Sequence, residues 1–529
     1  MRLLLFLFLL LSISLSSFAQ NEPAWFNVMD YGATADTSAL STDAFQQALD
    51  AARKAGGGTV YVPPGNFLCG SIRLYSYTTL HVEGGATVWA SRRKEDYTLF
   101  GSKAKQPVLL YADSAHHISL IGKGRLHGQA RRVYKDLKQV DGFIAKETAQ
   151  AKAYGVEMKM YYKVAPWVTP VFFYHSTDIT LEDISIIEGG FWLLDIKQCD
   201  RIFIRGAYLE SSLDQGVNAD GIDIDGCRDV VISDCIVITG DDAIVLKANY
   251  AKDANYHTEN VTVTNCVVTS TSTGLKLGTE SYGDYRHITF NNCVVRNSNR
   301  GLSIVVRDGG TVENVIFSNI TIETNRKHFN WWGDGDPIWV VLRKRRDNSD
   351  LGHIKNVLFE NIIAHGEGTS KIEGYAPNEM HPEGGYLENI RLHNVQLTTY
   401  PETKPDLRAT HGFEAHHVRG LHLDQVEIQW AGQPQNTWQS GIKIHESSEL
   451  RLRRLRVAPG LQGSPAIHLH QTQNVLVQDV EALPGTLRLL ELSGDRSKQF
   501  VLKDLDLMET ADQVLKVRAE IAREEIRRR

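Results

Sequence analysis

The sequence predicts an all-β protein folded as a right-handed parallel β-helix, a solenoid closed at its N-terminal end by a helical cap. First, a short phrase of alternating apolar residues around a central Asn or Asp returns about every 25 to 30 residues. Second, the phrases are rich in Val, Ile and Thr and are broken by Gly, Asn, Asp and Ser, with almost no helical periodicity. Units of this length cannot close a core alone, so we expect about ten or more stacked coils.

The repeat argues against a β-propeller, because a four-stranded blade needs about 40 residues and these units are shorter. The Asn or Asp at each centre is expected to form a ladder of side-chain amides that bind the turns of neighbouring coils. Clear copies of the phrase occupy residues 179–184, 231–236, 261–267 and 288–294, and weaker copies occupy 315–320, 357–362, 390–395, 421–426, 450–455 and 475–480.

Composition limits the possible partners. The 529 residues include 57 basic and 63 acidic side chains, a formal net charge of −6, so no basic excess is present to neutralise nucleic acid and we expect no nucleic-acid partner. Six cysteines are too few for a disulfide scaffold of this size. Most lie at matching points of the repeat, which predicts free thiols buried in the core.

The N-terminus predicts export. An apolar run from Leu3 to about Leu15 follows one basic residue and precedes the small residues Ser17 and Ala19, which is the pattern of a secretory signal peptide over residues 1–19. The run is shorter than the ~20 residues of a membrane span. We therefore expect a secreted or periplasmic protein with no membrane partner after cleavage.

The rest of the chain is expected to form one catalytic β-helix domain over residues 20–510. Its cap spans about residues 27–90 and contains an amphipathic helix that opens at Ser41 or Thr42. Residues 131–168 carry no repeat phrase and are expected to be an inserted loop. The charged tail, residues 511–529, is helical in pattern and predicts a solvated closing helix.

Polar residues crowd together once along the chain. Asp220 and the pair Asp241–Asp242 are separated by about one coil, so they should stack on adjacent strands ~4.8 Å apart. Carboxylates this close resist simultaneous ionisation, so one should keep a proton, as a general acid must. A protonated carboxyl with a partner carboxylate is the arrangement that glycoside hydrolysis uses. From the residues alone, turn capping or calcium binding explains the cluster equally well.

Three sequence motifs indicate a family. These are Asn-x-Asp-Gly at 218–221, Gly-Asp-Asp at 240–242, and an Asp-Tyr-Gly-Ala opening from Asp30 with the strand Gly-Gly-Gly-Thr-Val-Tyr-Val-Pro-Pro-Gly at 56–65. Together, over about residues 27–400, they resemble glycoside hydrolase family 28. This family contains the polygalacturonases and rhamnogalacturonan hydrolases, which are inverting enzymes on a right-handed β-helix.

The resemblance implies site residues position by position. Asp241 is similar to the family's general acid, while Asp220 and Asp242 are similar to the pair that activates water. Asn218 falls on a position that orders this group. Asp223 and Asp225 are expected to be structural. We expect neither a metal ion nor an organic cofactor.

The sequence departs from the family pattern in two places. Thr273 stands where the family has a His, and Ser303 and Val305 stand where it has the Arg and Lys that hold a galacturonate carboxylate. A neutral sugar such as rhamnose would fit a subsite from which these cations are missing. The substrate-binding residues expected to replace these cations are Lys247, Lys276 and Arg307.

We therefore expect a secreted, monomeric, inverting glycoside hydrolase of a pectic polysaccharide, either an exo-galacturonidase or a rhamnogalacturonan hydrolase. Insertions at 131–168 and 325–352 favour exo action, because loops can wall off a cleft. The alternatives are a β-helix polysaccharide lyase and a non-catalytic carbohydrate-binding solenoid. Aromatic residues that could stack on sugars, or simply pack, are Trp192, Trp331, Trp332 and Trp339.

Overall fold

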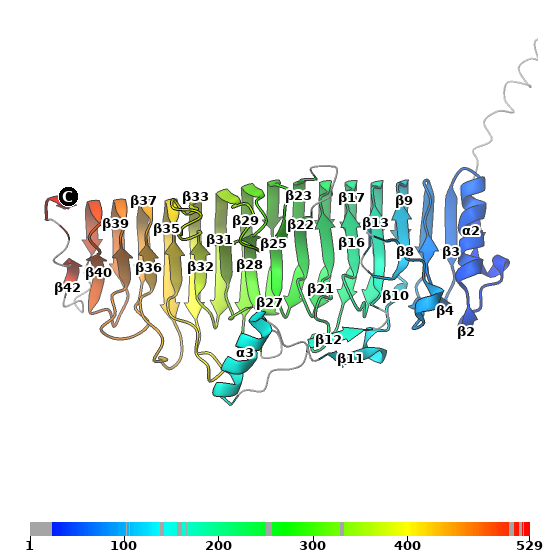
Figure 1. The fold of residues 1–529 in the computed structure, drawn as a ribbon, viewed down its shortest axis with the longest axis horizontal. Helices are drawn as coiled ribbons and strands as arrows, with labels where there is room; N and C mark the ends of the chain where they lie inside the picture. The colour runs from blue at the N-terminus through cyan, green and yellow to red at the C-terminus, as the bar shows by residue number, and fades with distance from the viewer. Residues whose placement is uncertain are drawn as a thin grey trace, which may run out of the picture.

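A computed structural model of the chain describes residues 24–528 except 102, 105, 138–141, 156–160, 165–166, 250–255, 328–332, 507–512, 518–520 and 522. The expected signal peptide, residues 1–19, lies outside the described residues. Strands stack along one axis into an elongated solenoid, with α2 (Thr42–Lys54) over the N-terminal end and the C-terminus at the other end (Figure 1). Neighbouring strands of the solenoid pair in parallel, as the sequence predicts.

One long face of the solenoid is a parallel sheet to which each coil contributes one strand. This sheet has 15 strands among the described residues, consistent with the expected number of coils. Its strands are β5 (Ile72–Arg73), β8 (Val108–Asp113), β13 (Thr169–Tyr174), β16 (Leu194–Lys197), β19 (Ile222–Asp225), β22 (Ile244–Ala248), β25 (Thr273–Ser281), β28 (Arg300–Val306), β30 (Ile338–Leu342), β32 (Ser370–Glu373), β34 (Phe413–His416), β36 (Ile442–His445), β38 (Ile467–His470), β40 (Arg488–Ser493) and β42 (Gln513–Val517).

The remaining faces form a second sheet of 26 described strands. They are β1 (Trp25–Asn27), β2 (Asp36–Leu40), β3 (Gly58–Val62), β4 (Gly65–Cys69), β6 (Thr78–Val82), β7 (Ala86–Ala90), β9 (His116–Ile121), β10 (Arg125–His127), β14 (Thr177–Glu182), β15 (Ser185–Ile187), β17 (Asp200–Arg205), β18 (Tyr208–Glu210), β20 (Arg228–Ser233), β21 (Ile236–Thr239), β23 (Thr258–Thr264), β24 (Val267–Ser270), β26 (Tyr285–Asn291), β27 (Val294–Ser298), β29 (Thr311–Thr324), β31 (His353–Gly366), β33 (Leu387–Thr399), β35 (Val418–Trp430), β37 (Ser448–Val457), β39 (Gln473–Ala482), β41 (Lys498–Asp506) and β43 (Ile526–Arg528).

The central Asn or Asp of each phrase lies at a corner of the coil. Asn319, Asn361 and Asn394 take φ values of 55°, 53° and 52°, a left-handed conformation that Asn tolerates well. Their side chains form the expected ladder: Asn361 donates to Asn319 at 3.0 Å, and Asn394 donates to Asn361 at 2.8 Å. These bonds run from side chain to side chain, not to the turn backbones as expected, because each amide meets its counterpart one coil away.

The interior is apolar along the whole solenoid. Inward-facing side chains stack from coil to coil, as in the aligned rings of Phe290, Phe317 and Phe359, whose centroids lie 4.9 and 5.1 Å apart. All six cysteines are free and buried, as predicted. Among the described residues, no helix combines the length and apolar character that crossing a membrane requires.

The N-terminal cap contains the expected amphipathic helix. Helix α2 buries Phe45 and Leu49 against the first coils. Its N-cap residue is Ser41, but the Ser41 hydroxyl donates to the carbonyl of Thr34 at 3.2 Å instead of capping the helix. The short 3₁₀ helices of the chain are η1 (Val28–Tyr31), η2 (Lys94–Asp96), η3 (Ala130–Arg132) and η4 (Arg523–Glu525).

The insertion after residue 131 has structure of its own. It contains an antiparallel hairpin, β11 (Tyr134–Leu137) with β12 (Tyr161–Val164), and helix α3 (Gly142–Ala153). These elements project from one long edge of the solenoid (Figure 1).

The expected closing helix over residues 511–529 is wrong. The described residues of the tail form β42, η4 and β43 instead. β42 pairs with β40, and β43 pairs with β41, so the β-helix continues past residue 510. The open edges of the last coil offer unpaired backbone groups, and pairing with them outweighs the helical pattern of the tail.

Candidate active site

A cleft of about 430 Å³ opens on the outer face of the 15-stranded sheet. It lies over β19, β22, β25, β28 and β30, so consecutive coils supply its walls. The residues that line it are Trp192, Asn218, Asp220, Asp241, Asp242, Lys247, Ser272, Lys276, Thr279, Glu280, Arg300, Val305, Arg307, Trp339, Arg343, Lys344 and Arg345. All seven site residues expected from the sequence are among them.

The three predicted carboxylates meet in this cleft. Asp220 directly precedes β19, and Asp241 and Asp242 lie between β21 and β22, so stacking of the coils brings them together. One oxygen from each carboxylate lies within 4.8 Å of the others. Asp220 and Asp242 are each 2% exposed, and Asp241 is half-buried.

A bend after Gly240 turns the neighbouring Asp241 and Asp242 into the same cleft. Within this bend, Asp241 accepts two backbone hydrogen bonds, from Asp242 at 2.9 Å and from Asn218 at 3.1 Å. The Ser270 hydroxyl donates to the Asp241 carbonyl at 2.6 Å. These bonds hold the bend, so two consecutive side chains face one side where an extended strand would separate them.

Two buried lysines compensate the acidic charge. The Lys276 ammonium donates to Asp242 Oδ2 at 2.5 Å. The Lys247 ammonium donates to Asp220 Oδ2 at 3.1 Å, lies 3.6 Å from Glu280 Oε2, and stands 4.0 Å from the centroid of the Trp192 ring. Asp220 and Asp242 therefore each have their own cation, whereas no ion pair of Asp241 is found among the described residues.

This unequal pairing affects the pKa values of the carboxyl groups and of Lys247. Burial, together with the carboxylates of Asp220 and Asp242, raises the pKa of Asp241 well above its usual range. Burial raises the pKa of Asp220 to about 6, although Lys247 opposes that shift. Burial would lower the pKa of Lys247, but its carboxylate neighbours, Asp220 first, raise it well above the usual value. These shifts favour the protonated form of Asp241 and the charged form of Lys247.

Asp223 and Asp225 lie behind the cleft and do not line it. Asp225 accepts hydrogen bonds from the backbone and side chain of Asn249, at 2.7 and 2.9 Å. Asp223 is fully buried, with one oxygen 3.1 Å from the Lys247 ammonium but not aligned for a hydrogen bond. Burial raises the pKa of Asp223 well above its usual value. Both residues fit the structural role expected from the sequence.

A basic wall also lines the cleft. We use this name for Arg307, Arg343, Lys344 and Arg345. Arg345 is held by Asp308 through two hydrogen bonds of 2.7 and 2.9 Å. Arg307 differs, because its buried Nε has no hydrogen-bond partner. Burial and the neighbouring Arg345 lower the pKa of Arg307. Sequence reasoning identified Arg307 alone, although the basic run at 343–346 within an insertion was a signal for the other three.

The structure shows where the residues that depart from the family pattern lie: Thr273, Ser303 and Val305. Thr273 is buried and contributes its backbone N–H, 3.2 Å from Asp242 Oδ1. The hydroxyl that reaches this carboxylate belongs to Ser272, at 2.8 Å, a residue that sequence reasoning missed. Ser303 is 1% exposed and lies outside the cleft lining, whereas Val305 lines the cleft.

Two of the four candidate tryptophans line the cleft, Trp192 and Trp339. Trp339 carries the Arg300 guanidinium 3.5 Å from its ring centroid, and Arg300 also donates to Asp336 at 3.0 Å. The other two, Trp331 and Trp332, lie outside the described residues. Arg300 and Thr279 carried no motif in the sequence, and only the stacking of coils brings them into the lining.

The carboxylate trio could offer three oxygens to a metal ion. Two of those carboxylates already contact the ammonium groups of Lys247 and Lys276, at 3.1 and 2.5 Å. A divalent cation at this position would be repelled by both lysines. The donor set therefore favours proton chemistry over metal binding.

Comparison with known proteins identifies the family of the chain. The family described as Glycosyl hydrolases family 28 matches residues 59–329, just over half of the chain. A probable polygalacturonase from Vitis vinifera is 23% identical over 239 residues, which are 42% of this chain and 44% of the relative. An exo-poly-alpha-D-galacturonosidase from Dickeya chrysanthemi is 25% identical over 269 residues, 44% of this chain and 43% of the relative. The matches thus span less than half the length of these relatives.

The structural comparison extends further along the chain. The crystal structure of a hyperthermoactive exopolygalacturonase from Thermotoga maritima superposes with a TM-score of 0.57 and 22% identity, over 82% of this chain and 93% of that chain. The shared fold is the right-handed parallel β-helix, as the sequence predicts. By the match of its sequence over residues 59–329, the chain belongs to glycosyl hydrolase family 28.

Proposed function

We propose that this protein is an exo-acting, inverting glycoside hydrolase that releases galacturonic acid from a pectic polysaccharide. One observation carries the proposal: one oxygen from each of three carboxylates lies within 4.8 Å of the others, and two of these carboxylates pair with lysines, in a cleft that basic residues also line. The carboxylates supply the chemistry, and the basic residues fit a substrate that carries a carboxylate on its sugar.

Asp241 acts as the general acid. It holds a proton because burial and two carboxylate neighbours raise its pKa. It donates that proton to the glycosidic oxygen as the bond to the anomeric carbon breaks. Asp220 and Asp242 polarise a water between them and accept its proton as the water attacks the same carbon. Lys247 and Lys276 pair with these two carboxylates.

Inversion is proposed because two carboxylates face the acid and can hold a water jointly. Their nearest oxygens lie within 4.8 Å of Asp241, closer than the ~6.5–9.5 Å separation usual in inverting enzymes. A retaining enzyme would instead place one carboxylate at the anomeric carbon. NMR of the first product formed distinguishes the two outcomes by the anomer released.

Arg307 is the proposed ligand of the galacturonate carboxylate. Its buried Nε lacks a hydrogen-bond partner, while Arg345 beside it is already held by Asp308. A substrate carboxylate would satisfy this donor with a charge-assisted bond. The basic wall thus takes the place of the two family cations that Ser303 and Val305 replace.

Exo action is proposed from the walls of the cleft. Arg343, Lys344 and Arg345 follow β30 within the insertion at 325–352 and line the cleft, together with Trp339 of β30. A cleft walled by such an insertion leaves room for a chain terminus and obstructs a chain that passes through. Export is proposed from the N-terminal pattern alone, and action as a monomer from a cleft built within one chain.

The test is to incubate the protein with galacturonan oligomers and with rhamnogalacturonan oligomers of defined length. Galacturonic acid as the sole early product supports the proposal, and a ladder of mixed oligomers would overturn exo action. Release of rhamnose from rhamnogalacturonan alone would select the neutral-sugar alternative. An ultraviolet-absorbing unsaturated product, lost on addition of a chelator, would identify a lyase. Absence of any product would identify a binding protein.

A further inference from the structure

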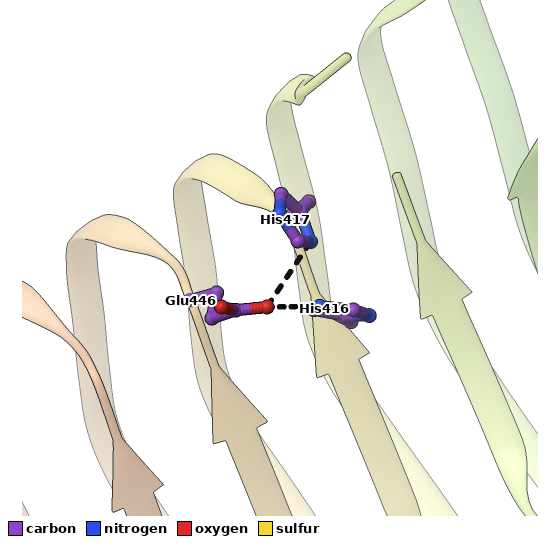
Figure 2. Close-up of side chains that lie close together, drawn as sticks. All are labelled: His416, His417 and Glu446. Atoms are coloured by element: carbon purple, nitrogen blue, oxygen red, sulfur yellow. Dashed lines mark hydrogen bonds and ion pairs between the residues drawn. The ribbon is translucent and has the colours of Figure 1, made fainter. Parts of the chain in front are cut away.

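A second cluster of possible metal ligands lies on the C-terminal coils, outside the family-matched residues. His416 ends β34, His417 follows it at the corner of the coil, and Glu446 occupies the same corner of the next coil, after β36. Figure 2 shows the Glu446 side chain directed at both histidines across the gap between the two coils. One donor atom from each of the three residues lies within 4.8 Å of the others.

The three donor atoms lie close enough together to share a small divalent cation, which would replace the hydrogen bond between His416 and Glu446. Glu446 Oε2 lies 2.6 Å from His416 Nε2 and 3.7 Å from His417 Nδ1. Ligand atoms of a tetrahedral zinc site, at bond lengths near 2.0–2.1 Å, are separated by about 3.3 Å. The observed distances lie on either side of this value. A shift of the carboxylate toward equal distances would complete one face of a tetrahedron.

The Nδ1 atom of His417 forms no hydrogen bond with any of the described residues. The residue is 2% exposed, and its buried Nδ1 has no hydrogen-bond partner. A buried polar atom without a partner is rare and unfavourable. A metal ion between His417 and Glu446 would give this nitrogen its ligand bond. This orphaned atom, independent of the clustering itself, points to a ligand.

Neighbouring side chains hold the other two ligands in place. Arg496 donates to Glu446 Oε1 at 3.0 Å, so the second oxygen faces the histidines. The His416 ring stacks on His445 of the next coil, with centroids 3.8 Å apart. Such supporting contacts orient metal ligands in general. The His416 side chain is 19% exposed and that of Glu446 is 33% exposed, so an ion can reach the cluster from solvent.

We propose that His416 Nε2, His417 Nδ1 and Glu446 Oε2 bind one Zn²⁺ ion that ties the corners of two successive coils together. Two imidazoles and one carboxylate are a donor set suited to zinc, with a fourth position left for water. The ion has a structural role. It lies on the same sheet face as the cleft, but four strands lie between β22 and β34, which puts them five strand spacings, or about 24 Å, apart.

The test uses the full chain without a polyhistidine tag, stripped with chelator and titrated with Zn²⁺ by calorimetry. We expect one Zn²⁺ per chain, an affinity at least about 10-fold weaker in Glu446→Gln and in His417→Gln, and a thermal midpoint that zinc raises in the wild type but not in these two variants. His393→Gln is the matched control, because His393 lies 3.5 Å from the single carboxylate of Asp424 on an exposed corner. Asp241→Asn, in the other cluster of possible ligands, should also bind as the wild type does.

Failure to bind zinc stoichiometrically, or equal binding by the wild type and both ligand variants, would overturn the proposal. So would loss of the ion in Asp241→Asn. If the ligand variants do not fold, Co²⁺ added to the wild type decides: intense visible absorption supports a tetrahedral site with nitrogen ligands, and its absence contradicts one. Hydrolysis by the wild type should be equal with and without chelator, so the outcome is independent of the enzymatic proposal.

Discussion

The cleft and the corner ladder use the same residue types for opposite purposes. Asp234 and Asn265 sit exposed on successive corners, where Asn265 donates to Asp234 at 3.2 Å. Asp241 lies seven residues after Asp234 on the same coil, yet burial and two carboxylate neighbours raise its pKa well above the usual range. The comparison shows that the solenoid repeats backbone positions without repeating environments. An Asp becomes chemically unusual only where the coil buries it against other charges.

The sharpest test of this contrast is the same substitution at both places. Asp241→Asn removes the proton donor, so kcat should fall by about 10²- to 10⁴-fold or more, the usual contribution of a general acid. Asp234→Asn, on the preceding corner, should leave kcat unchanged. Steady-state kinetics on a galacturonan oligomer measure both variants. Equal activity of the two would remove Asp241 from the mechanism.

Arg307→Met tests the basic wall of the cleft. Loss of one charge-assisted hydrogen bond should lower kcat/KM on galacturonides about 10- to 100-fold. Arg205→Met is the control, because Arg205 pairs with Glu182 on the outside of the solenoid. If Arg307→Met hydrolyses galacturonides as well as the wild type does, the carboxylate is bound elsewhere.

The pH dependence tests the paired carboxylates. Because burial raises the pKa of Asp220 to about 6, lowering the pH through 6 should protonate this base and reduce the rate about tenfold per pH unit. Lys247 lowers that pKa, so Lys247→Met should shift the acidic limb upward by about one unit or more. Lys197→Met, which removes the partner of Asp225 at 3.5 Å, should not move it. An unshifted limb in Lys247→Met would mean that another group controls the acidic limb.

The smallest effect is expected on the ladder itself. Asn361→Ala loses hydrogen bonds to Asn319 and Asn394 and places Ala at a φ of 53°, so the free energy of unfolding should fall by about 1–2 kcal/mol. Asn361→Gly loses the same bonds without the backbone strain, so it should be less destabilising. Urea unfolding measures the difference, and hydrolysis should be unchanged in both. An equal loss in the two variants would show that the left-handed conformation of this corner costs Ala nothing.

Much of the fold was predictable because the same short phrase of strand and turn residues recurs along the chain. The period-two phrases place residues such as Val261 and Val263 in the core, and the corner Asn265 follows from its place in the phrase. The tail was mispredicted because a helical pattern was weighed without the open strands of the last coil, with which β42 pairs. At the end of a solenoid, pairing with the unpaired backbone of the last coil outweighs a local helical pattern.

The candidate site was predictable only in part. Asp220, Asp241 and Asp242 lie in motifs at a spacing of one coil, so their convergence followed from the repeat. Arg300 belongs to no motif, and Arg345 lies within an insertion whose path the period does not describe. His417 and Glu446 lie 29 residues apart without any phrase in common, and only the register of β34 with β36 brings them together.

By itself the sequence determined the solenoid, its capped N-terminal end, its free buried thiols and the coil on which each acidic residue lies. These properties depend on the periodic pattern of apolar and polar residues, which can be recognised from residues that are close together in the sequence. Only the tertiary structure decided which carboxylate keeps its proton, which arginine lacks a partner, and which histidine nitrogen is buried alone. Those properties depend on charges and contacts supplied by other coils, and the Coulomb and desolvation energies that set them change steeply over a few ångströms.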